Sequence, residues 1–215
     1  MIKLVIFDLD GTLLNTIEDL AVSTNYALEK HGFSTHPIEA YNFFVGNGIR
    51  KLVERALPEN FRDKATVDVV LDDFVNYYDK HSTVLTKPYD GIIEVLTQLT
   101  KQGIGIAVAS NKYQAATEEL VSKYFGDFEF IEVLGQREGV APKPDSVIVE
   151  DILKKFSGEK ANVLFVGDSG VDMQTAINSG VKAVAVSWGF RPVSELQQFS
   201  PEYLINKPAE LLSLF

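Results

Sequence analysis

The sequence contains no cysteine, which excludes disulfides, a thiolate nucleophile and any zinc or iron–sulfur site built on sulfur. Its three histidines, His31, His36 and His81, are too scattered along the chain for an obvious metal cluster. No stretch approaches the roughly 18 consecutive apolar residues of a membrane-spanning helix. We therefore expect no membrane partner, and we expect any bound metal ion to have oxygen ligands.

Positive charge is also scarce. The chain has 20 Lys and Arg against 30 Asp and Glu, which gives a net charge of −10. Nucleic-acid phosphates and anionic membrane surfaces repel such a protein, so a nucleic-acid partner is not expected. The apolar run near residue 1 becomes charged within a few residues, unlike a secretion signal. We expect a cytoplasmic protein, and its oligomeric state stays open.

Hydrophobic residues are plentiful, at 46% of 215 residues, so the chain can bury a core of one or two domains. Four short apolar runs, at residues 2–7, 104–109, 163–166 and 183–186, are typical of parallel strands covered on both faces. Helical patterns separate the runs from about residue 90 onward. This alternation predicts an α/β fold, with a Rossmann-like parallel sheet and helices on both faces.

Residues 15–82 break the alternation. Apolar residues recur there at helical spacing, as in the segments 49–57 and 67–78. The pattern predicts a small all-helical domain at residues 15–82, inserted after the first strand of an α/β core formed by residues 1–14 and 83–215. Residues 87–91 look like a turn that returns the chain to the sheet.

Carboxylates follow two of the predicted strands. Asp8 and Asp10 come directly after the first run, and Asp168 follows the run at 163–166. Ligands of open parallel sheets bind at the carboxyl ends of the strands, so these side chains should meet. An all-oxygen site of this kind suits Mg²⁺. This ion usually retains several water ligands, and its other ligands are commonly one or two carboxylates and phosphate oxygens.

Hydrogen-bond donors follow the strands as well. Gly11 and Thr12 supply a tight turn whose amide groups can face an anion. Ser110, Asn111 and Lys143 can donate to phosphate oxygens. Any one of these groups alone is more often a solvated turn, a helix cap or an exposed lysine. Their joint position at one end of the predicted sheet favours a site for a phosphoryl group.

These residues fall into four motifs, in order along the chain, that resemble those of the haloacid dehalogenase superfamily of hydrolases. The motifs are residues 7–12 (Phe-Asp-Leu-Asp-Gly-Thr), 110–112 (Ser-Asn-Lys), 143–144 (Lys-Pro) and 167–172 (Gly-Asp-Ser-Gly-Val-Asp). The helical insert is similar to the cap domain of the phosphoglycolate phosphatase-like branch, as are residues 45–48, 186–190 and 208–211. Ser146 departs from the pattern, since many relatives have a second proline there.

The resemblance implies a covalent phosphatase mechanism. Asp8 would attack phosphorus to give an aspartyl-phosphate, and Asp10 would protonate the leaving alcohol and then activate water. Mg²⁺ would be held by the Asp8 carboxylate, the Asp10 backbone carbonyl and Asp168. Asp172 would lie next to these ligands without contacting the ion. The cap would close over the site, with hinges near residues 14–16 and 80–86.

The same resemblance assigns substrate contacts. Ser110, Asn111 and Lys143 would bind the transferring phosphoryl group, and Lys143 would also screen the charge of Asp8. In the cap, the candidates for contacting the leaving group and determining substrate specificity are Gly46, Asn47 and Arg50. Basic residues on an amphipathic helix more often belong to its solvated face, and that reading of Arg50 stays open.

The expected function is therefore Mg²⁺-dependent hydrolysis of a small phosphorylated metabolite, similar to phosphoglycolate. Alternatives within the superfamily are a sugar phosphomutase of the β-phosphoglucomutase type, a pyrophosphatase and a nucleotidase. Thr12 favours the phosphatase, because the mutase pattern commonly has valine at that position. A phosphoacceptor signalling domain is the non-enzymatic alternative, but it needs no helical cap and does not usually carry Asp-x-Asp at its first strand.

Overall fold

The computed structural model describes residues 1–215. Six parallel strands form a central sheet in the order β5-β4-β1-β6-β7-β8. The strands are β1 (Leu4–Phe7), β4 (Gly105–Tyr113), β5 (Val133–Gln136), β6 (Val163–Gly167), β7 (Lys182–Val186) and β8 (Tyr203–Ile205). The four predicted strands are all present, and the structure adds β5 and β8 at the two edges.

Helices cover both faces of this sheet, so the predicted fold class is confirmed. One face carries α5 (Ile92–Lys101), α6 (Gln114–Phe125) and the 3₁₀ helix η3 (Pro208–Leu214); the other carries α7 (Val147–Leu153), α8 (Gly170–Ser179) and α9 (Val193–Gln197), with η2 (Lys160–Asn162) before β6. Successive strand residues point to opposite faces. Val5 and Phe7 therefore enter one apolar cluster, while Leu4 and Ile6 enter the other.

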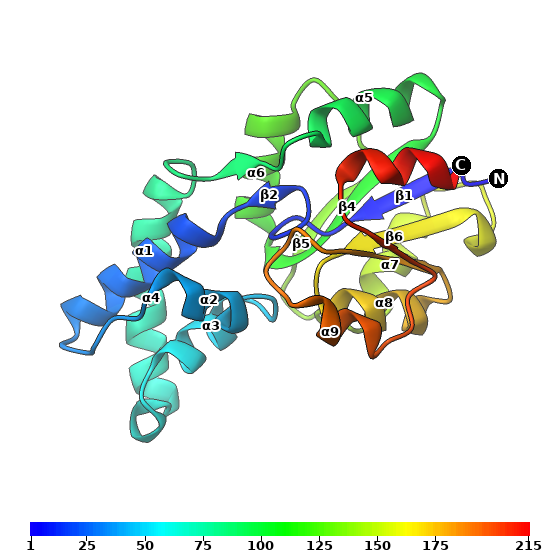
Figure 1. Ribbon diagram of the computed structural model, residues 1–215. Coiled ribbons are helices and arrows are strands. Elements are labelled where there is room, and N and C mark those ends of the chain that lie inside the picture. Colours follow the sequence, from blue (N-terminus) through cyan, green and yellow to red (C-terminus); the bar gives the residue numbers. More distant parts are fainter.

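Four α-helices lie together at one end of the molecule, opposite the two termini (Figure 1). They are α1 (Ile17–Lys30), α2 (Ile38–Phe44), α3 (Ile49–Ala56) and α4 (Lys64–His81), with the 3₁₀ helix η1 (Glu59–Phe61) between α3 and α4. Their apolar faces share a separate core of 16 buried residues, one of which, Ala116, comes from α6. We call this group the helical cap. No helix of the protein is both long and apolar enough to cross a membrane.

The two chain segments that join the cap to the sheet pair with each other. β2 (Leu14–Asn15) and β3 (Lys87–Pro88) form a short antiparallel ribbon. The prediction of a turn at residues 87–91 was therefore wrong for its first two residues, because the partner strand comes from a segment more than 70 positions away. In the same region, the buried Asp19 carboxylate of α1 accepts hydrogen bonds from the backbone N–H groups of Leu85 and Thr86 at 2.8–3.0 Å.

Candidate active site

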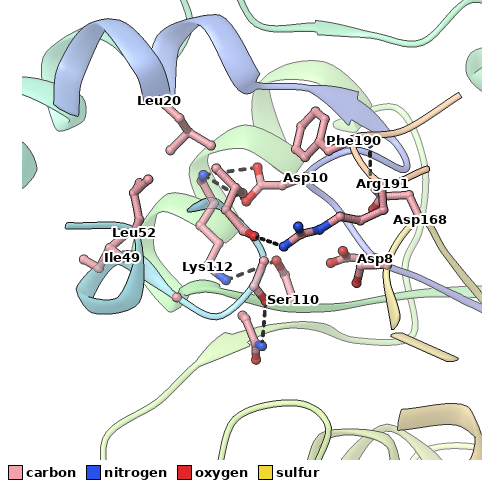
Figure 2. A pocket seen from close by; sticks show the side chains of 15 residues that line it. Asp8, Asp10, Leu20, Ile49, Leu52, Ser110, Lys112, Asp168, Phe190 and Arg191 are labelled. Atoms are coloured by element: carbon pink, nitrogen blue, oxygen red, sulfur yellow. Dashed lines mark hydrogen bonds and ion pairs between the residues drawn. The ribbon is translucent and has the colours of Figure 1, made fainter. Parts of the chain in front are cut away.

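The carboxyl ends of β1, β4 and β6 meet beneath the cap and enclose a cavity of about 30 Å³. Figure 2 shows side chains of the sheet and of the cap facing this space. The lining residues are Asp8, Asp10, Leu20, Val45, Gly46, Gly48, Ile49, Leu52, Ser110, Asn111, Lys112, Asp168, Ser169, Phe190 and Arg191. A cavity of this size has room for only a few water-sized groups.

Asp8 lies directly after β1, and its carboxylate is buried. Oδ1 accepts a hydrogen bond from the backbone N–H of Leu9 at 2.7 Å and lies 2.9 Å from Lys143 Nζ. Burial, helped by the nearby Asp172 carboxylate, raises the pKa of Asp8 from 3.8 to about 7, even though Lys143 opposes the shift. The folded protein thus holds a carboxylate in a place where negative charge is costly.

Asp168 lies directly after β6 and is held by two donors. Its Oδ2 accepts a hydrogen bond from the backbone N–H of Phe190 at 2.7 Å, and its Oδ1 accepts one from Thr12 Oγ1 at 3.3 Å. Burial, followed by the charges of Asp172 and Asp8, raises its pKa well above 3.8. Gly11 makes room for it: its φ is +86°, and a Cβ there would lie 2.4 Å from Asp168 Oδ2. Only glycine satisfies both conditions.

Asp172 orients Lys143. Its Oδ1 accepts a hydrogen bond from Lys143 Nζ at 2.7 Å, while its Oδ2 accepts hydrogen bonds from the backbone and hydroxyl of Ser169 in a capping box at the start of α8. Burial lowers the pKa of Lys143, but the charges of Asp172 and Asp8 outweigh it, and the net shift is upward. The lysine is therefore fixed as a cation between two carboxylates.

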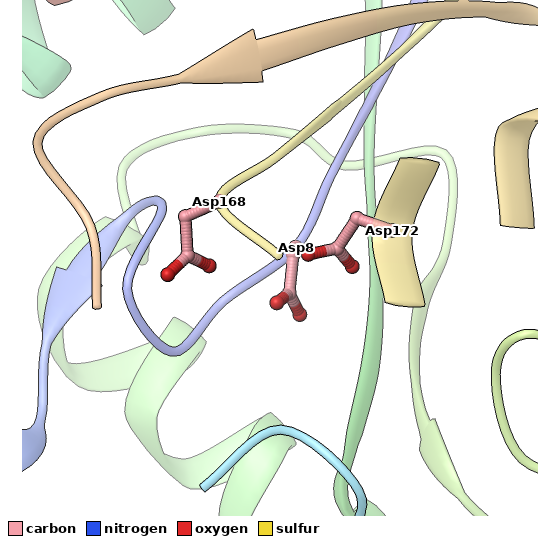
Figure 3. A group of neighbouring side chains, drawn as sticks. All are labelled: Asp8, Asp168 and Asp172. Atoms are coloured by element: carbon pink, nitrogen blue, oxygen red, sulfur yellow. The ribbon is translucent and has the colours of Figure 1, made fainter. Parts of the chain in front are cut away.

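The donor set fits a divalent cation. Carboxylate oxygens of Asp8, Asp168 and Asp172 lie within 4.8 Å of one another, and all three residues are buried (Figure 3). Three buried carboxylates with one lysine leave excess negative charge, and hard oxygen donors are the ligands that Mg²⁺ prefers. Asp8 Oδ2 accepts no hydrogen bond, and Asp168 Oδ1 accepts only the 3.3 Å bond from Thr12. Because Lys143 and Ser169 occupy both oxygens of Asp172, Asp8 and Asp168 are the carboxylates better placed to contact an ion.

Asp10 is paired with Lys112, a contact that the sequence did not reveal. Lys112 Nζ lies 3.2 Å from each Asp10 carboxylate oxygen, and Thr16 Oγ1 donates a hydrogen bond to Oδ1 at 2.7 Å. The Lys112 side chain is 1% exposed, and its ammonium group lies 4.7 Å from the centre of the Tyr78 ring in α4. The sequence feature that could have pointed to Lys112 as a site residue is its position in the motif at residues 110–112, directly after the buried run at 104–109.

Ser110 and Asn111 extend β4 beyond its predicted end at residue 109 and reach the site. Ser110 lines the cavity. The Asn111 amide instead donates hydrogen bonds to the backbone carbonyls of Gly46 and Lys143, both at 3.0 Å, and its oxygen accepts one from the Lys143 N–H. In this conformation Asn111 joins the cap to the loop that carries the lysine, so its amide donors are not free for a phosphate.

The cap residues singled out in the sequence have different positions. Gly46 lines the cavity, but Asn47 does not, and its Oδ1 accepts a hydrogen bond from Arg55. Arg50 also lies outside the cavity lining, with its guanidinium group 2.6 Å from the Asp68 carboxylate. Its side chain is 47% exposed, as is usual for a solvated helix face.

A model of the family described as haloacid dehalogenase-like hydrolase matches residues 5–186. The chain belongs to this family. It is 31% identical to a phosphoglycolate phosphatase of Mesorhizobium japonicum, over 94% of this chain and 90% of that one. It is 36% identical to a phosphoglycolate phosphatase of Pseudomonas syringae pv. tomato, over 90% and 73% of the two chains. The family expected from the sequence is thereby confirmed.

Solved structures agree with the family match. The crystal structure of a "predicted phosphoglycolate phosphatase" from Haemophilus somnus 129pt superimposes with a TM-score of 0.90 at 27% sequence identity, and the match covers 99% of this chain and 97% of that one. The likeness spans both the sheet and the helical cap of this haloacid dehalogenase-like hydrolase.

Proposed function

We propose that this hydrolase is a Mg²⁺-dependent phosphatase of small phosphomonoesters that resemble phosphoglycolate. The observation that carries the proposal is the buried group formed by Asp8, Asp168 and Lys143 at the carboxyl edge of the sheet, with Asp10 beside it. The names of its relatives point to the same substrate class.

In the proposed reaction the Asp8 carboxylate attacks phosphorus, and the bond between phosphorus and the ester oxygen breaks. Asp10 donates a proton to the departing alkoxide, which leaves as an alcohol. Asp10 then takes a proton from water as this water attacks phosphorus, which releases phosphate and restores Asp8. Lys112 and Thr16 hold the Asp10 carboxylate for both proton transfers.

The negative charges of Asp8 and of the phosphate would repel each other without compensation. Lys143 supplies one positive charge at Asp8, and Ser110 supplies a hydroxyl donor at the cavity wall. Asp8, Asp168 and the Asp10 backbone carbonyl would hold Mg²⁺, which when bound offsets charge on the phosphoryl oxygens. The amide groups of Gly11 and Thr12 are donors in the same turn.

We further propose that residues 15–82 act as a mobile cap over a catalytic core formed by residues 1–14 and 83–215. The cap supplies Leu20, Ile49 and Leu52 to the cavity wall, and these apolar side chains exclude water from the reacting groups. The proposed hinges are at residues 14–16, which include β2, and at residues 80–86, which end directly before β3.

A panel of phosphate esters tests the proposal. Phosphoglycolate, sugar phosphates, nucleoside monophosphates and pyrophosphate are incubated with the purified protein, with and without Mg²⁺, and released phosphate is measured. We expect Mg²⁺-dependent release that is fastest from phosphoglycolate or an ester of similar size. Faster hydrolysis of pyrophosphate or of a nucleotide would show that this compound, and not a small phosphomonoester, represents the substrate class. Interconversion of sugar phosphates without release of phosphate would indicate a mutase.

A further inference from the structure

Two cationic side chains line the cavity, Lys112 and Arg191, and they differ in what neutralises them. Lys112 is paired with the Asp10 carboxylate. The Arg191 guanidinium group instead donates hydrogen bonds to uncharged backbone carbonyls, those of Val45 at 3.0 Å and Phe43 at 3.4 Å. Arg191 is therefore the cavity cation whose hydrogen-bond partners carry no charge.

The carboxylate nearest to Arg191 is a weak partner. Glu195 Oε2 lies 4.0 Å from Arg191 Nε, and its side chain is 32% exposed. Its other oxygen accepts a hydrogen bond from the backbone N–H of Gly170. An ion pair at this distance, near solvent, contributes little. A ligand carboxylate inside the cavity would meet a guanidinium group with most of its charge uncompensated.

Arg191 is placed close to the reacting groups. It directly follows Phe190, whose backbone N–H donates to the Asp168 carboxylate at 2.7 Å. Figure 2 shows its side chain extending from this side of the site into the cavity. The side chain is 12% exposed, and its hydrogen bonds to protein all come from Nη2. Nη1 is thus a further donor for a bound group.

The cap loop at residues 43–48 has other anchors. Arg55 donates hydrogen bonds to the Phe44 carbonyl at 2.8 Å and to the Asn47 side chain at 2.7 Å, and Asn111 donates one to the Gly46 carbonyl. Burial lowers the pKa of Arg55, and the positive charge of Arg191 lowers it further. Two cations beside the same loop repel each other, which is costly if both serve only to fasten it.

We propose that Arg191 is a specificity-determining residue that binds a carboxylate on the leaving group of the substrate. This inference rests on the phosphatase function proposed above. A planar guanidinium group matches a carboxylate in geometry and forms paired, charge-assisted hydrogen bonds with it. Arg191 and Asp8 line the same cavity. The phosphate of a short phosphorylated acid would therefore lie at Asp8 and its carboxylate at Arg191, with the proposed cap movement making room for the ester.

The test compares two esters that differ in this one group. 2-Phosphoglycolate carries a carboxylate where 2-hydroxyethyl phosphate carries an uncharged hydroxymethyl group. We measure kcat/KM for both, with Mg²⁺, in the wild type, Arg191→Gln, Arg191→Lys and Arg55→Gln. Because both esters are assayed on the same preparation, their kcat/KM ratio does not depend on the folded fraction.

We expect the wild type to prefer phosphoglycolate, and Arg191→Gln to lower kcat/KM for this ester roughly 10- to 100-fold, the range for a lost charge-assisted hydrogen bond. Hydrolysis of 2-hydroxyethyl phosphate should change far less, and Arg191→Lys should keep part of the preference. Arg55→Gln loosens the same loop without removing a cavity charge, so it should lower both activities by similar factors.

Equal losses for both esters in Arg191→Gln would overturn the inference and leave Arg191 as a fastener of the cap. An unchanged preference in that variant would overturn it as well. A wild type that hydrolyses both esters equally well would exclude carboxylate recognition while retaining the phosphatase function. A wild type that hydrolyses no phosphate ester would remove the proposed function itself, and the inference with it.

Discussion

Among single residues, Lys112 makes the contact that its motif alone does not reveal. It comes from β4, but its ammonium group reaches the Asp10 carboxylate after β1 and lies over the Tyr78 ring of the cap. The buried Lys112 side chain thus links Asp10, which is proposed to act as both acid and base, to Tyr78 of the cap. Sequence order places Lys112 and Asp10 102 residues apart, and only the pairing of β1 with β4 brings them together.

Replacing Lys112 should slow catalysis more than it weakens binding. In Lys112→Met the Asp10 carboxylate loses its charged donor and its orientation, so we expect kcat to fall roughly 10- to 100-fold, in line with the usual worth of such a hydrogen bond. Lys112→Arg keeps the charge and should recover part of the rate. Steady-state kinetics separate kcat from KM. A loss confined to KM would show that Lys112 binds substrate rather than positioning Asp10.

Asp8 and Asp168 link pH to stability. Their pKa values are raised in the folded protein, to about 7 for Asp8, so the folded state holds these protons more tightly than the unfolded state does. The metal-free protein should therefore lose stability as the pH rises from about 4 to about 7. Mg²⁺ bound to these carboxylates, as proposed, would compete with the protons, so its stabilising effect should grow over the same range.

Thermal unfolding with and without Mg²⁺ measures this effect. At pH 8, with Mg²⁺ at roughly 100 times its Kd, we expect Tm to rise by about 5 °C or more, and by much less at pH 5. Asp168→Asn should abolish the rise, whereas Asp72→Asn, an exposed control in α4, should keep it. An equal rise at both pH values would mean that the ion binds away from these carboxylates.

At the scale of elements, the ribbon of β2 and β3 and the carboxylate of Asp19 fix the base of the cap. Asp19 belongs to α1, yet it satisfies the backbone N–H groups of Leu85 and Thr86 on the returning segment. The two connections between cap and sheet are thus held together at both the ribbon and the first helix.

Asp19→Ala should destabilise the protein by about 1–3 kcal/mol, because it leaves the backbone N–H groups of Leu85 and the buried Thr86 without their acceptor. Asp72→Ala, which removes an exposed carboxylate from the same cap, should change the free energy of unfolding by less than about 0.5 kcal/mol. Denaturant unfolding measures both values. Equal, small effects would show that water replaces the Asp19 contacts at no cost.

Element prediction succeeded where the pattern was strong. Continuous apolar runs such as residues 163–166 revealed central strands, because these strands are covered on both faces. The edge strand β5 (Val-Leu-Gly-Gln) has only two apolar residues, and β8 (Tyr-Leu-Ile) has three residues in all, so neither forms an apolar run as long as that of β1. β2 and β3 lie on either side of the cap in the sequence, and their pairing leaves no local pattern from which it could be predicted.

For the molecule as a whole, the net charge of −10 is compatible with the proposed anionic substrate. The carboxylates at the site would be offset by a bound Mg²⁺ together with Lys112, Lys143 and Arg191. The sequence placed Asp8, Asp168 and Lys143 at one sheet edge from topology alone, since parallel strands share their carboxyl edge. It did not give the partners of Asn111, nor the position of Arg191 in the cavity, because both depend on how the cap meets the sheet.

The central claim is that Asp8 is the nucleophile of a Mg²⁺-dependent phosphatase. The most direct test is the phosphatase kcat of Asp8→Asn, measured on the best ester of the panel. The control is Asp90→Asn, which makes the same substitution at an exposed position. We predict a loss of roughly 10⁴-fold or more, no fall in the Tm of the metal-free protein because a repelling buried charge is removed, and full activity in the control. An Asp8→Asn protein that keeps its Tm and turns over within tenfold of the wild type would contradict the account.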